Sequence, residues 1–329
     1  MQNIKKTSEY IELKRKFDDY YTSKLYPILE QSNHTRERYV AAFVALLLMA
    51  FVFYPLLWYL WYNGILQDSA VGIILALSGI VILLACGPFY RCHKKVKPQI
   101  MPIFADFFGS FSYTFEGKID DTLLRRSNLF KNYNKSIGYD FFCGTYNGVH
   151  ISIAEEKLLQ IKRDFRNFEV KKKVFGGICV LLEMNKNFKG RTVVLKDGGI
   201  LGNTLNKIAG LQNVRLEDSH FEKIFEVYSD DQIEARYLLT TGFMERMLKL
   251  RDLYDGKSVQ FCFDNNKLLL SVPTSYNMFE ADSFFHSNTN KAKIDTVFDQ
   301  FYLIFSIVNL LKLNQKIGLY CCVYPYIRN

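Results

Sequence analysis

The sequence predicts an α+β protein, in which a two-helix transmembrane hairpin is followed by a domain of antiparallel β-hairpins with long helices. Three observations predict this fold class. Charged residues are almost absent between residues 39 and 90, short apolar runs separated by turn residues recur downstream, and two long helical patterns interrupt those runs. We therefore expect four parts: a cytosolic arm (1–38), a membrane hairpin (39–90), a basic juxtamembrane linker (91–100) and a cytosolic α+β domain (101–329).

Two apolar runs, residues 39–62 and 70–90, are long enough to cross a bilayer as helices. A helix needs ~20 apolar residues to span ~30 Å of hydrocarbon. The outside loop between them, residues 63–69, contains no Lys or Arg, whereas both outer flanks are basic. Because basic flanks stay on the cytosolic side, both termini are expected in the cytosol.

The residues expected to anchor the hairpin are aromatic at one end and basic at the other. Trp58 and Trp61 close the first run and are typical of an interfacial aromatic belt. The basic side chains after the second run are expected to face anionic headgroups; they are Arg91, Lys94, Lys95 and Lys97. Neither run has a charged interior residue, which favours an anchor over a transport pathway.

Small residues recur on one face of the second run, at Gly72, Ala76 and Gly79. Small side chains let helices approach closely. The stripe is expected either to pack inside the hairpin or to form an oligomer interface.

Residues 7–30 of the arm have the pattern of an amphipathic helix. Tyr10, Leu13, Phe17 and Tyr20 recur at helical spacing, and charges of both signs fill the other face. Mixed charge favours packing on protein over binding to lipid, and pairing with another copy stays open.

Turn residues separate paired apolar runs at three places in the domain, which predicts three β-hairpins. The paired runs are 141–145 with 149–153, around Asn147-Gly148; 175–184 with 192–195; and 258–263 with 267–272. The aromatic tail, residues 317–327, is a candidate extra strand.

Four helices are expected around these strands. Residues 103–111 predict a short buried helix, and Asp120 and Asp121 predict the start of another. Ser229 and Gln232 have the spacing of a capping box and open a long helix, which breaks at residues 240–242. Residues 294–313 contain polar interruptions, which indicates a buried helix rather than a third span.

Several segments carry a resemblance to one known family; they are Phe175–Gly177, Asn185–Val194, Arg215–Asp218 with Phe221–Glu222, and Phe225–Tyr237. The chain resembles a widespread bacterial family of uncharacterised membrane proteins, a domain of unknown function, over roughly residues 103–313. The resemblance implies a bacterial inner-membrane protein with a membrane hairpin and a cytosolic domain, and it implies no reaction. Relatives often have proline where this chain has Thr241, which supports the helix break there.

No established catalytic, metal or cofactor motif occurs in the sequence. The seven cysteines are scattered and are expected to be reduced thiols, and the five histidines are far apart. The glycine-containing segment 193–208 fits no phosphate-loop fingerprint and is expected to be a plain loop. We therefore expect no catalytic residue, no metal site and no cofactor.

One polar cluster is a candidate interaction site; its residues are Asp230, Asp231, Glu234 and Arg236. Glu234 follows Asp230 by four residues, so the two acids would share a helix face. Paired acids could perform acid–base chemistry. The simpler interpretation is a helix cap with an internal salt bridge, for instance from Arg236 to Glu217 or Asp218.

Three functions follow as hypotheses. The first is a membrane-anchored interaction or scaffold module, whose partners are the lipid bilayer and either other proteins or further copies of the chain. The second is a membrane-associated enzyme or ligand-binding domain acting on an anionic lipid or nucleotide, since the net charge is +9. The third is an auxiliary subunit of a membrane complex. Nucleic acid is not an expected partner, because no nucleic-acid-binding motif is present.

Overall fold

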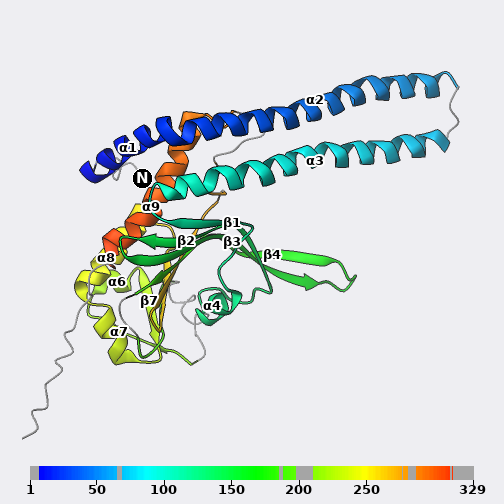
Figure 1. Ribbon diagram of the computed structural model, residues 1–329. Coiled ribbons are helices and arrows are strands. Elements are labelled where there is room, and N and C mark those ends of the chain that lie inside the picture. Colours follow the sequence, from blue (N-terminus) through cyan, green and yellow to red (C-terminus); the bar gives the residue numbers. More distant parts are fainter. Residues whose placement is uncertain are drawn as a thin grey trace, which may run out of the picture. The chain divides into compact units, whose positions relative to one another are not determined.

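The computed structural model forms two compact units, each described here by itself (Figure 1). The helical unit comprises Ser8–Phe108 and Met278–Asp299, and the sheet unit comprises Gly109–Asn277 and the chain from Gln300 onward, with Met1–Thr7. The structure describes residues 7–64, 69–184, 188–197, 210–275, 277–280, 287–311 and 313. The expected tail strand at 317–327 and most of the glycine-containing loop, from residue 198 onward, lie outside these residues.

Long helices make up most of the helical unit (Figure 1). They are α1 (Ser8–Tyr20), a π-helical turn (Tyr21–Leu25), α2 (Tyr26–Tyr62) and α3 (Ser69–Asp106). The expected basic linker, residues 91–100, is helical and belongs to α3. The separate helix expected at 103–111 is wrong, because α3 runs to Asp106 and a strand begins at Phe111. Val96, Ile100 and Phe104 are all buried at four-residue spacing, so one apolar stripe holds this stretch as a single helix.

The apolar stretch of α2 has the length and composition of a membrane anchor. The best window of the helical segment Ser8–Tyr62 has a mean hydropathy of 2.6 and none of it is buried. The second predicted run lies in α3, where few side chains between residues 69 and 93 are described. Gly72 and Gly79 are exposed there, and a Cβ built on either would meet no described atom within 4 Å. These two glycines therefore do not pack inside the hairpin among the described residues.

The N-terminal arm packs on protein, as its mixed charges predict. Its buried stripe consists of Tyr10, Phe17, Tyr21, Leu25 and Leu29. The ring of Phe17 lies 5.8, 5.2 and 4.5 Å from the ring centroids of Phe104, Phe107 and Phe298. The last of these rings belongs to the first part of α9 (Lys291–Leu311), so the arm, α3 and α9 share one aromatic core.

A charged network covers this aromatic core. Lys14 Nζ lies 2.9 Å from Asp18 Oδ1 and 2.7 Å from Asp295 Oδ1, and Lys291 Nζ binds the same two carboxylates at 2.5 and 2.6 Å. Tyr10 Oη donates to Asp299 Oδ1 at 2.6 Å. Because Lys14, Lys291, Asp18 and Asp295 each take part in two ion pairs, the entropy lost in ordering one side chain is shared between two interactions. The network links the arm to α9.

Lys97 does not join the basic boundary with Lys94 and Lys95, which are exposed. Its side chain is only 2% exposed, and Nζ lies 3.2 Å from Glu280 Oε1. The expectation for Lys97 is wrong because position 97 shares the buried face of α3 with Ile100, and a carboxylate from a distant segment satisfies the charge.

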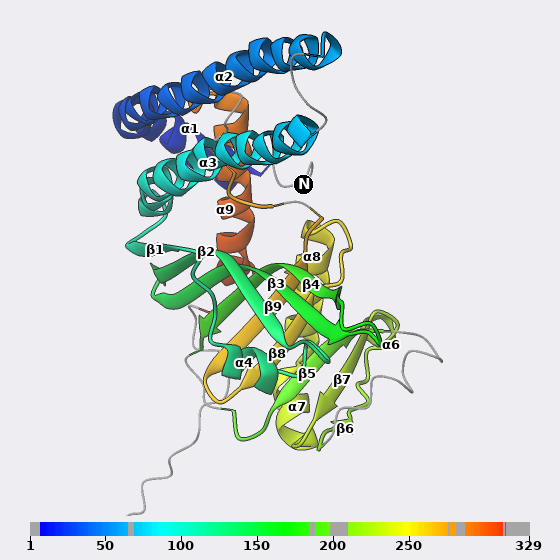
Figure 2. The same cartoon turned by 90° about the vertical axis from the view of Figure 1, so that its right-hand side faces the viewer.

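The sheet unit contains a nine-stranded antiparallel sheet in the described residues, with order β1-β2-β3-β4-β9-β8-β5-β7-β6 (Figure 2). The strands are β1 (Phe111–Phe115), β2 (Lys135–Tyr146), β3 (Val149–Arg163), β4 (Glu169–Glu183), β5 (Thr192–Lys196), β6 (Gln212–Asn213), β7 (Phe225–Ser229), β8 (Gln260–Asp264) and β9 (Lys267–Pro273). The helices are α4 (Asp121–Arg126), α6 (Ser219–Glu222), α7 (Gln232–Leu238) and α8 (Thr241–Leu253), with α9 from Gln300 onward. The α+β fold class is thus confirmed.

Two of the three predicted hairpins are confirmed. β2 and β3 join at Asn147 and Gly148, whose φ angles of 49° and 80° suit a tight hairpin turn, and β8 and β9 join at Asn265-Asn266. The hairpin predicted between residues 175–184 and 192–195 is wrong. β4 pairs with β9, and β5 pairs with β8 and β7, so the β8–β9 hairpin lies between the two predicted partners.

The helix predictions in the sheet unit are largely confirmed. Asp120 caps α4 by accepting from Thr122 N at 2.9 Å, and α7 and α8 are separate helices that meet at Thr240. α9 is an apolar helix of mean hydropathy 1.4, but 67% of that window is buried, as expected of a core helix rather than a third span.

Alternating side chains give the sheet two buried faces. Phe141 packs against a cluster that includes Leu124 of α4, Leu158 and Cys179. Its neighbour Phe142 points to the opposite face, where its ring lies 5.1 Å from that of Phe301 in α9. Because successive residues of a strand point to opposite faces, β2 contributes to both cores.

Glu156 of β3 is a carboxyl group buried in this sheet, with 1% of its surface exposed. Its Oε1 accepts from Ile119 N at 2.8 Å, and Ser136 Oγ lies 3.2 Å from Oε2. Burial raises the pKa of Glu156 to about 7, because the charged form loses its hydration. The group therefore binds its proton in the folded protein over a range where the unfolded chain has released it.

We expect Glu156→Gln to stabilise the protein at pH 8, by on the order of 2–3 kcal/mol, and to have no such effect below the ordinary pKa. The folded pKa is raised, so the wild-type protein loses stability as the pH rises from about 4.5 to about 7. Glutamine keeps an acceptor for Ile119 N and offers a donor to Ser136 Oγ. Thermal unfolding of the detergent-solubilised chain across this range measures the difference. Parallel pH profiles for both proteins would contradict the prediction.

Candidate interaction surface

The four predicted site residues lie where β7 passes into α7. Asp231, rather than Ser229, is the N-cap, because its side chain accepts from Ile233 N at 3.0 Å and from Glu234 N at 2.9 Å. Ser229 is the last residue of β7, and its Oγ accepts from Asp231 N at 3.1 Å. The predicted capping box is therefore wrong by two residues, since the strand continues through Ser229.

Asp230 supports the same turn from outside the helix. Its Oδ1 accepts from Arg191 N at 2.6 Å, beside the start of β5. Asp230 precedes α7, so it does not share a helix face with Glu234 as predicted. The structure thus brings Asp230 and Asp231 together in one turn, which both stabilise, and this agrees with the helix-cap part of the simpler interpretation.

Arg236 does not form the internal salt bridge predicted for it. Asp218 instead caps α6, accepting from His220 N and Phe221 N at 2.9 and 3.0 Å. Across the described ranges, no carboxylate lies within ion-pair distance of Arg236, which is exposed on α7. Its guanidinium is available to a partner.

The exposed face of α7 also carries two large apolar side chains. Ile233 is 68% exposed and Tyr237 is 57% exposed, four residues apart and therefore neighbours on one face. Ala235 and Leu238, on the other face, are buried. The exposed face of this short helix therefore combines two large apolar side chains with Arg236, and the spacing of Ile233 and Tyr237 is a signal that the sequence prediction did not use.

A hollow of 410 Å³ lies beside this face, at the junction of α7 and α8. It is lined by Arg215, Leu216, Glu217, Arg236, Leu239, Thr240, Thr241 and Met244. Its rim holds charges of both signs, and its floor includes the apolar side chains of Leu239 and Met244. Exposed apolar side chains next to such a hollow are typical of a protein-binding surface.

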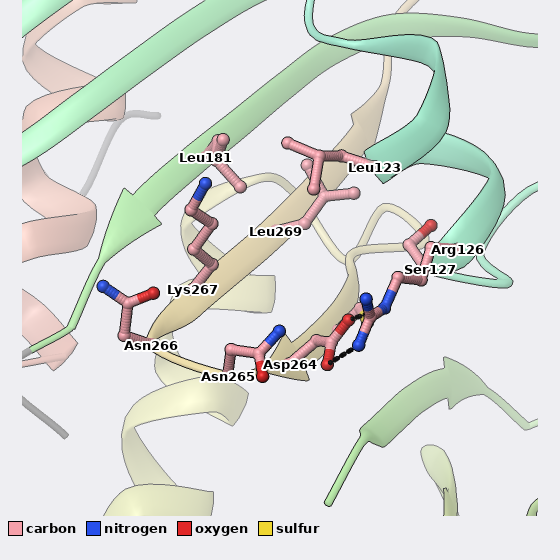
Figure 3. A pocket seen from close by; sticks show the side chains of 10 residues that line it. Leu123, Arg126, Ser127, Leu181, Asp264, Asn265, Asn266, Lys267 and Leu269 are labelled. Carbon is pink, nitrogen blue, oxygen red and sulfur yellow. Dashed lines mark hydrogen bonds and ion pairs between the residues drawn. The ribbon is translucent and has the colours of Figure 1, made fainter. Parts of the chain in front are cut away.

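A second pocket, of 350 Å³, lies between α4 and the β8–β9 hairpin (Figure 3). Arg126 closes one side, with Nε 2.5 Å from Asp264 Oδ2 and Nη2 3.1 Å from Oδ1. Asn265, Asn266 and Lys267 line the other side (Figure 3). Leu123, Leu181 and Leu269 also line the pocket, so it combines apolar and polar side chains.

The cysteine in this pocket is not suited to act as a nucleophile. Burial raises the pKa of the Cys262 thiol to about 12, so it stays protonated at neutral pH. The four cysteines that the structure describes are free; they are Cys92, Cys143, Cys179 and Cys262. Within the described part of the chain, no three His, Cys, Asp or Glu side chains gather in a way that could hold a metal ion.

The predicted membrane-anchoring residues lie at the two ends of the apolar helices. Trp58 is exposed, and its ring lies 5.2 Å from that of Trp61. Lys94 and Lys95 are exposed, and Lys95 Nζ lies 6.0 Å from the ring of Tyr39. The side chain of Arg91 lies outside the described residues. These positions fit an aromatic belt and a basic boundary, and their contact with lipid stays a prediction.

Comparisons with known proteins found a similarity to a solved structure and to a family model. The crystal structure of the mycobacterial trehalose monomycolate transport factor A, TtfA, is similar at 12% identity and a TM-score of 0.35, over 66% of this chain and 96% of that chain. A search of curated proteins found no match. Residues 173–313 match the family model described as a protein of unknown function, DUF3137. All the segments that carry the resemblance lie in this range, whereas the expected part from Ile103 to Lys172 lies outside it. Over residues 173–313, the chain is therefore similar to the DUF3137 family of proteins of unknown function.

Proposed function

We propose that the protein is a membrane-anchored interaction module that binds a protein partner through the exposed face of α7. The observation that carries this proposal is the exposure of Ile233 and Tyr237, one helical turn apart, beside the hollow and the guanidinium of Arg236, which no carboxylate of the described residues pairs with. Aromatic, aliphatic and arginine side chains of this kind dominate protein-binding hot spots.

The backbone of α7 is already ordered by contacts with the sheet. The Asp231 cap, the hydrogen bond from Arg191 N to Asp230 and the bond from Gln232 Nε2 to Gln212 Oε1 at 2.9 Å fix the helix to the sheet. A partner therefore has little backbone to order on binding. Burying Ile233 and Tyr237 would contribute roughly 1.5–3 kcal/mol each to association.

The anchor places this module at a bilayer. We infer that α2 and α3 cross the membrane as a hairpin, with both termini on the cytosolic side of a bacterial inner membrane. Support comes from the exposed apolar stretch of α2, the basic residues on both outer flanks and the absence of Lys and Arg from the loop at 63–69. The partner is either a different protein of that surface or a second copy of the chain.

The test is site-specific crosslinking in cells. A photoreactive phenylalanine analogue replaces Tyr237 in the tagged full-length chain, and adducts are identified by mass spectrometry after gentle solubilisation. We expect one dominant protein adduct. The double variant Ile233→Ser/Tyr237→Ser should reduce co-purification of the same protein at least about tenfold, because the apolar contact is lost.

Ile11→Ser is the matched control, since Ile11 is similarly exposed but lies on α1. It should leave co-purification unchanged. Equal recovery of the partner with the double variant would overturn the proposal, as would the absence of any protein adduct from position 237.

A ligand-binding function is the second candidate, favoured by the pocket in Figure 3. Arg126 and Lys267 could face an anionic group, although the guanidinium of Arg126 is already paired with Asp264. A preparation that carries a bound lipid or nucleotide but no protein adduct would favour this function over the interaction module.

A further inference from the structure

The β3–β4 hairpin extends beyond the rest of the sheet as a two-stranded ribbon (Figure 1). β2 stops pairing with β3 at Leu159, and β9 stops pairing with β4 at Gly177. β3 and β4 continue to pair up to Arg163 and Glu169. Among the described residues, the ribbon beyond Leu159 pairs with no third strand, and Asn134 hydrogen-bonds the backbone of Ile161 at its base. A two-stranded ribbon is only marginally stable in water, so the sheet itself does not account for this extension.

The end of this ribbon, residues 162–173, is called here the ribbon tip. It carries two aromatic side chains that are largely exposed on this unit. Phe165 is 91% exposed and Phe168 is 68% exposed, and Val170 beside them is also exposed. Within the described part of the sheet unit, the guanidinium of Arg166 lies 5.2 Å from the ring centroid of Phe165, and this contact leaves the ring 91% exposed.

The turn that presents the two rings is held in one shape. Asp164 Oδ1 accepts from Arg166 N and from Phe168 N, both at 2.9 Å, and Asn167 adopts a left-handed φ of 63°. Asn167 N also donates to the Asp164 carbonyl oxygen at 3.0 Å. The acid in the turn therefore orders the backbone.

The ribbon tip is strongly basic around the aromatic pair. It contains six basic and two acidic residues, a net charge of +4. One acid, Asp164, is occupied by the turn, and the other, Glu169, lies 3.8 Å from Lys171. In the described part of the chain, no carboxylate pairs with Lys162, Arg163, Lys172 or Lys173. The tip thus combines exposed aromatic rings with uncompensated positive charge.

We propose that the ribbon tip is a second membrane contact, which inserts Phe165 and Phe168 into the interface of an anionic bilayer. Aromatic rings prefer the headgroup region, and basic residues near an anionic leaflet strengthen association by about fivefold each. The apolar helix α2 supplies the reason to favour a bilayer over other anionic partners. An anchored chain holds its own sheet unit near lipid at a high effective concentration, so even a weak contact is populated.

Tryptophan fluorescence of the full-length chain in vesicles tests this proposal. The chain has two tryptophans. Trp58→Phe and Trp61→Phe remove them, and Phe165→Trp then reports on the tip alone. In vesicles of phosphatidylcholine with phosphatidylglycerol, we expect blue-shifted emission that brominated lipids quench. In vesicles of phosphatidylcholine alone, we expect the emission wavelength of a tryptophan exposed to water.

Two controls separate insertion from general proximity to the membrane. Tyr237→Trp in the same background places the probe at another exposed aromatic position of the sheet unit, and it should not be quenched. Lys172→Gln/Lys173→Gln should lower the ratio of inserted to free tip by roughly tenfold or more. Lys223→Gln/Lys249→Gln removes the same charge from exposed positions, one directly after α6 and one on α8, and should leave insertion unchanged.

Equal quenching at positions 165 and 237, or equal quenching in both lipid mixtures, would overturn the proposal. A tip that stays in water with every vesicle, but changes its emission when single-stranded DNA or an acidic peptide is added, would also overturn it and would assign the ribbon tip to an anionic macromolecule.

Discussion

Phe17→Ala is expected to destabilise the helical unit by about 3–5 kcal/mol, the usual cost of removing a buried phenylalanine from a packed core. Phe17 is fully buried, and its ring contacts those of Phe104, Phe107 and Phe298. The ammonium groups of Lys14 and Lys291 also lie within 5.5 Å of its centroid. Truncation leaves a cavity at the point where α1, α3 and α9 meet.

The measurement is thermal unfolding of the full-length chain in detergent, combined with limited proteolysis of the arm. We expect the unfolding midpoint to fall by on the order of 10 °C and the arm to become sensitive to protease. Ile11→Ala is the control, because Ile11 lies on the exposed face of α1 and should change stability by less than ~0.5 kcal/mol. If Phe17→Ala behaved like Ile11→Ala, the arm would not be docked in the way described.

Gly177→Ala is the second substitution with a large expected effect. Gly177 lies in β4 opposite Pro273 of β9, at the joint between the two halves of the sheet. A Cβ at this position would lie 2.2 Å from the carbonyl oxygen of Val272 and 2.7 Å from Thr274 N. Both are backbone atoms, so no side chain can rotate away. We expect a cost at or above the upper end of the ~1–3 kcal/mol typical of overpacking.

Hydrogen exchange measures where this cost falls. The amides of β4 and β9 near the joint should lose protection before those of the β2–β3 pair. Gly242→Ala is a control that should stabilise the protein rather than destabilise it. Gly242 lies in the first turn of α8, and the nearest atom to an added Cβ is Arg246 Nη1 at 3.9 Å. Alanine there should stabilise by about 0.5–1 kcal/mol. If Gly177→Ala left the stability unchanged, β4 and β9 would be able to move apart at this position without a cost in free energy.

Local signals in the sequence predicted local structure well. Asp120 accepts from Thr122 N as a helix cap, Asn147-Gly148 forms the hairpin turn between β2 and β3, and the chain breaks between α7 and α8 at Thr240. Each of these depends on interactions between residues a few positions apart, which the residue types at those positions largely determine.

The roles of charged residues were harder to predict. Lys97 has the same chemistry as Lys94 and Lys95, yet it alone is buried, because its partner Glu280 lies 183 residues away. Asp231 belonged to the predicted site cluster but caps the helix, and Asp230 holds the turn. The cluster stays a candidate site, and the structural role of Asp230 and Asp231 depends on backbone groups that only the fold brings near.

The sequence by itself determined the long apolar helix, the α+β class and the similarity of residues 173–313 to a family of unknown function, because length, periodicity and motif are properties of the linear chain. Only the tertiary structure decided that β9 and β8 separate β4 from β5, and that Ile233, Tyr237 and Phe165 remain exposed while neighbouring apolar side chains are buried. Strand pairing and side-chain exposure depend on contacts between residues far apart in sequence. The neighbours of an apolar residue in the sequence do not show whether the fold buries its side chain.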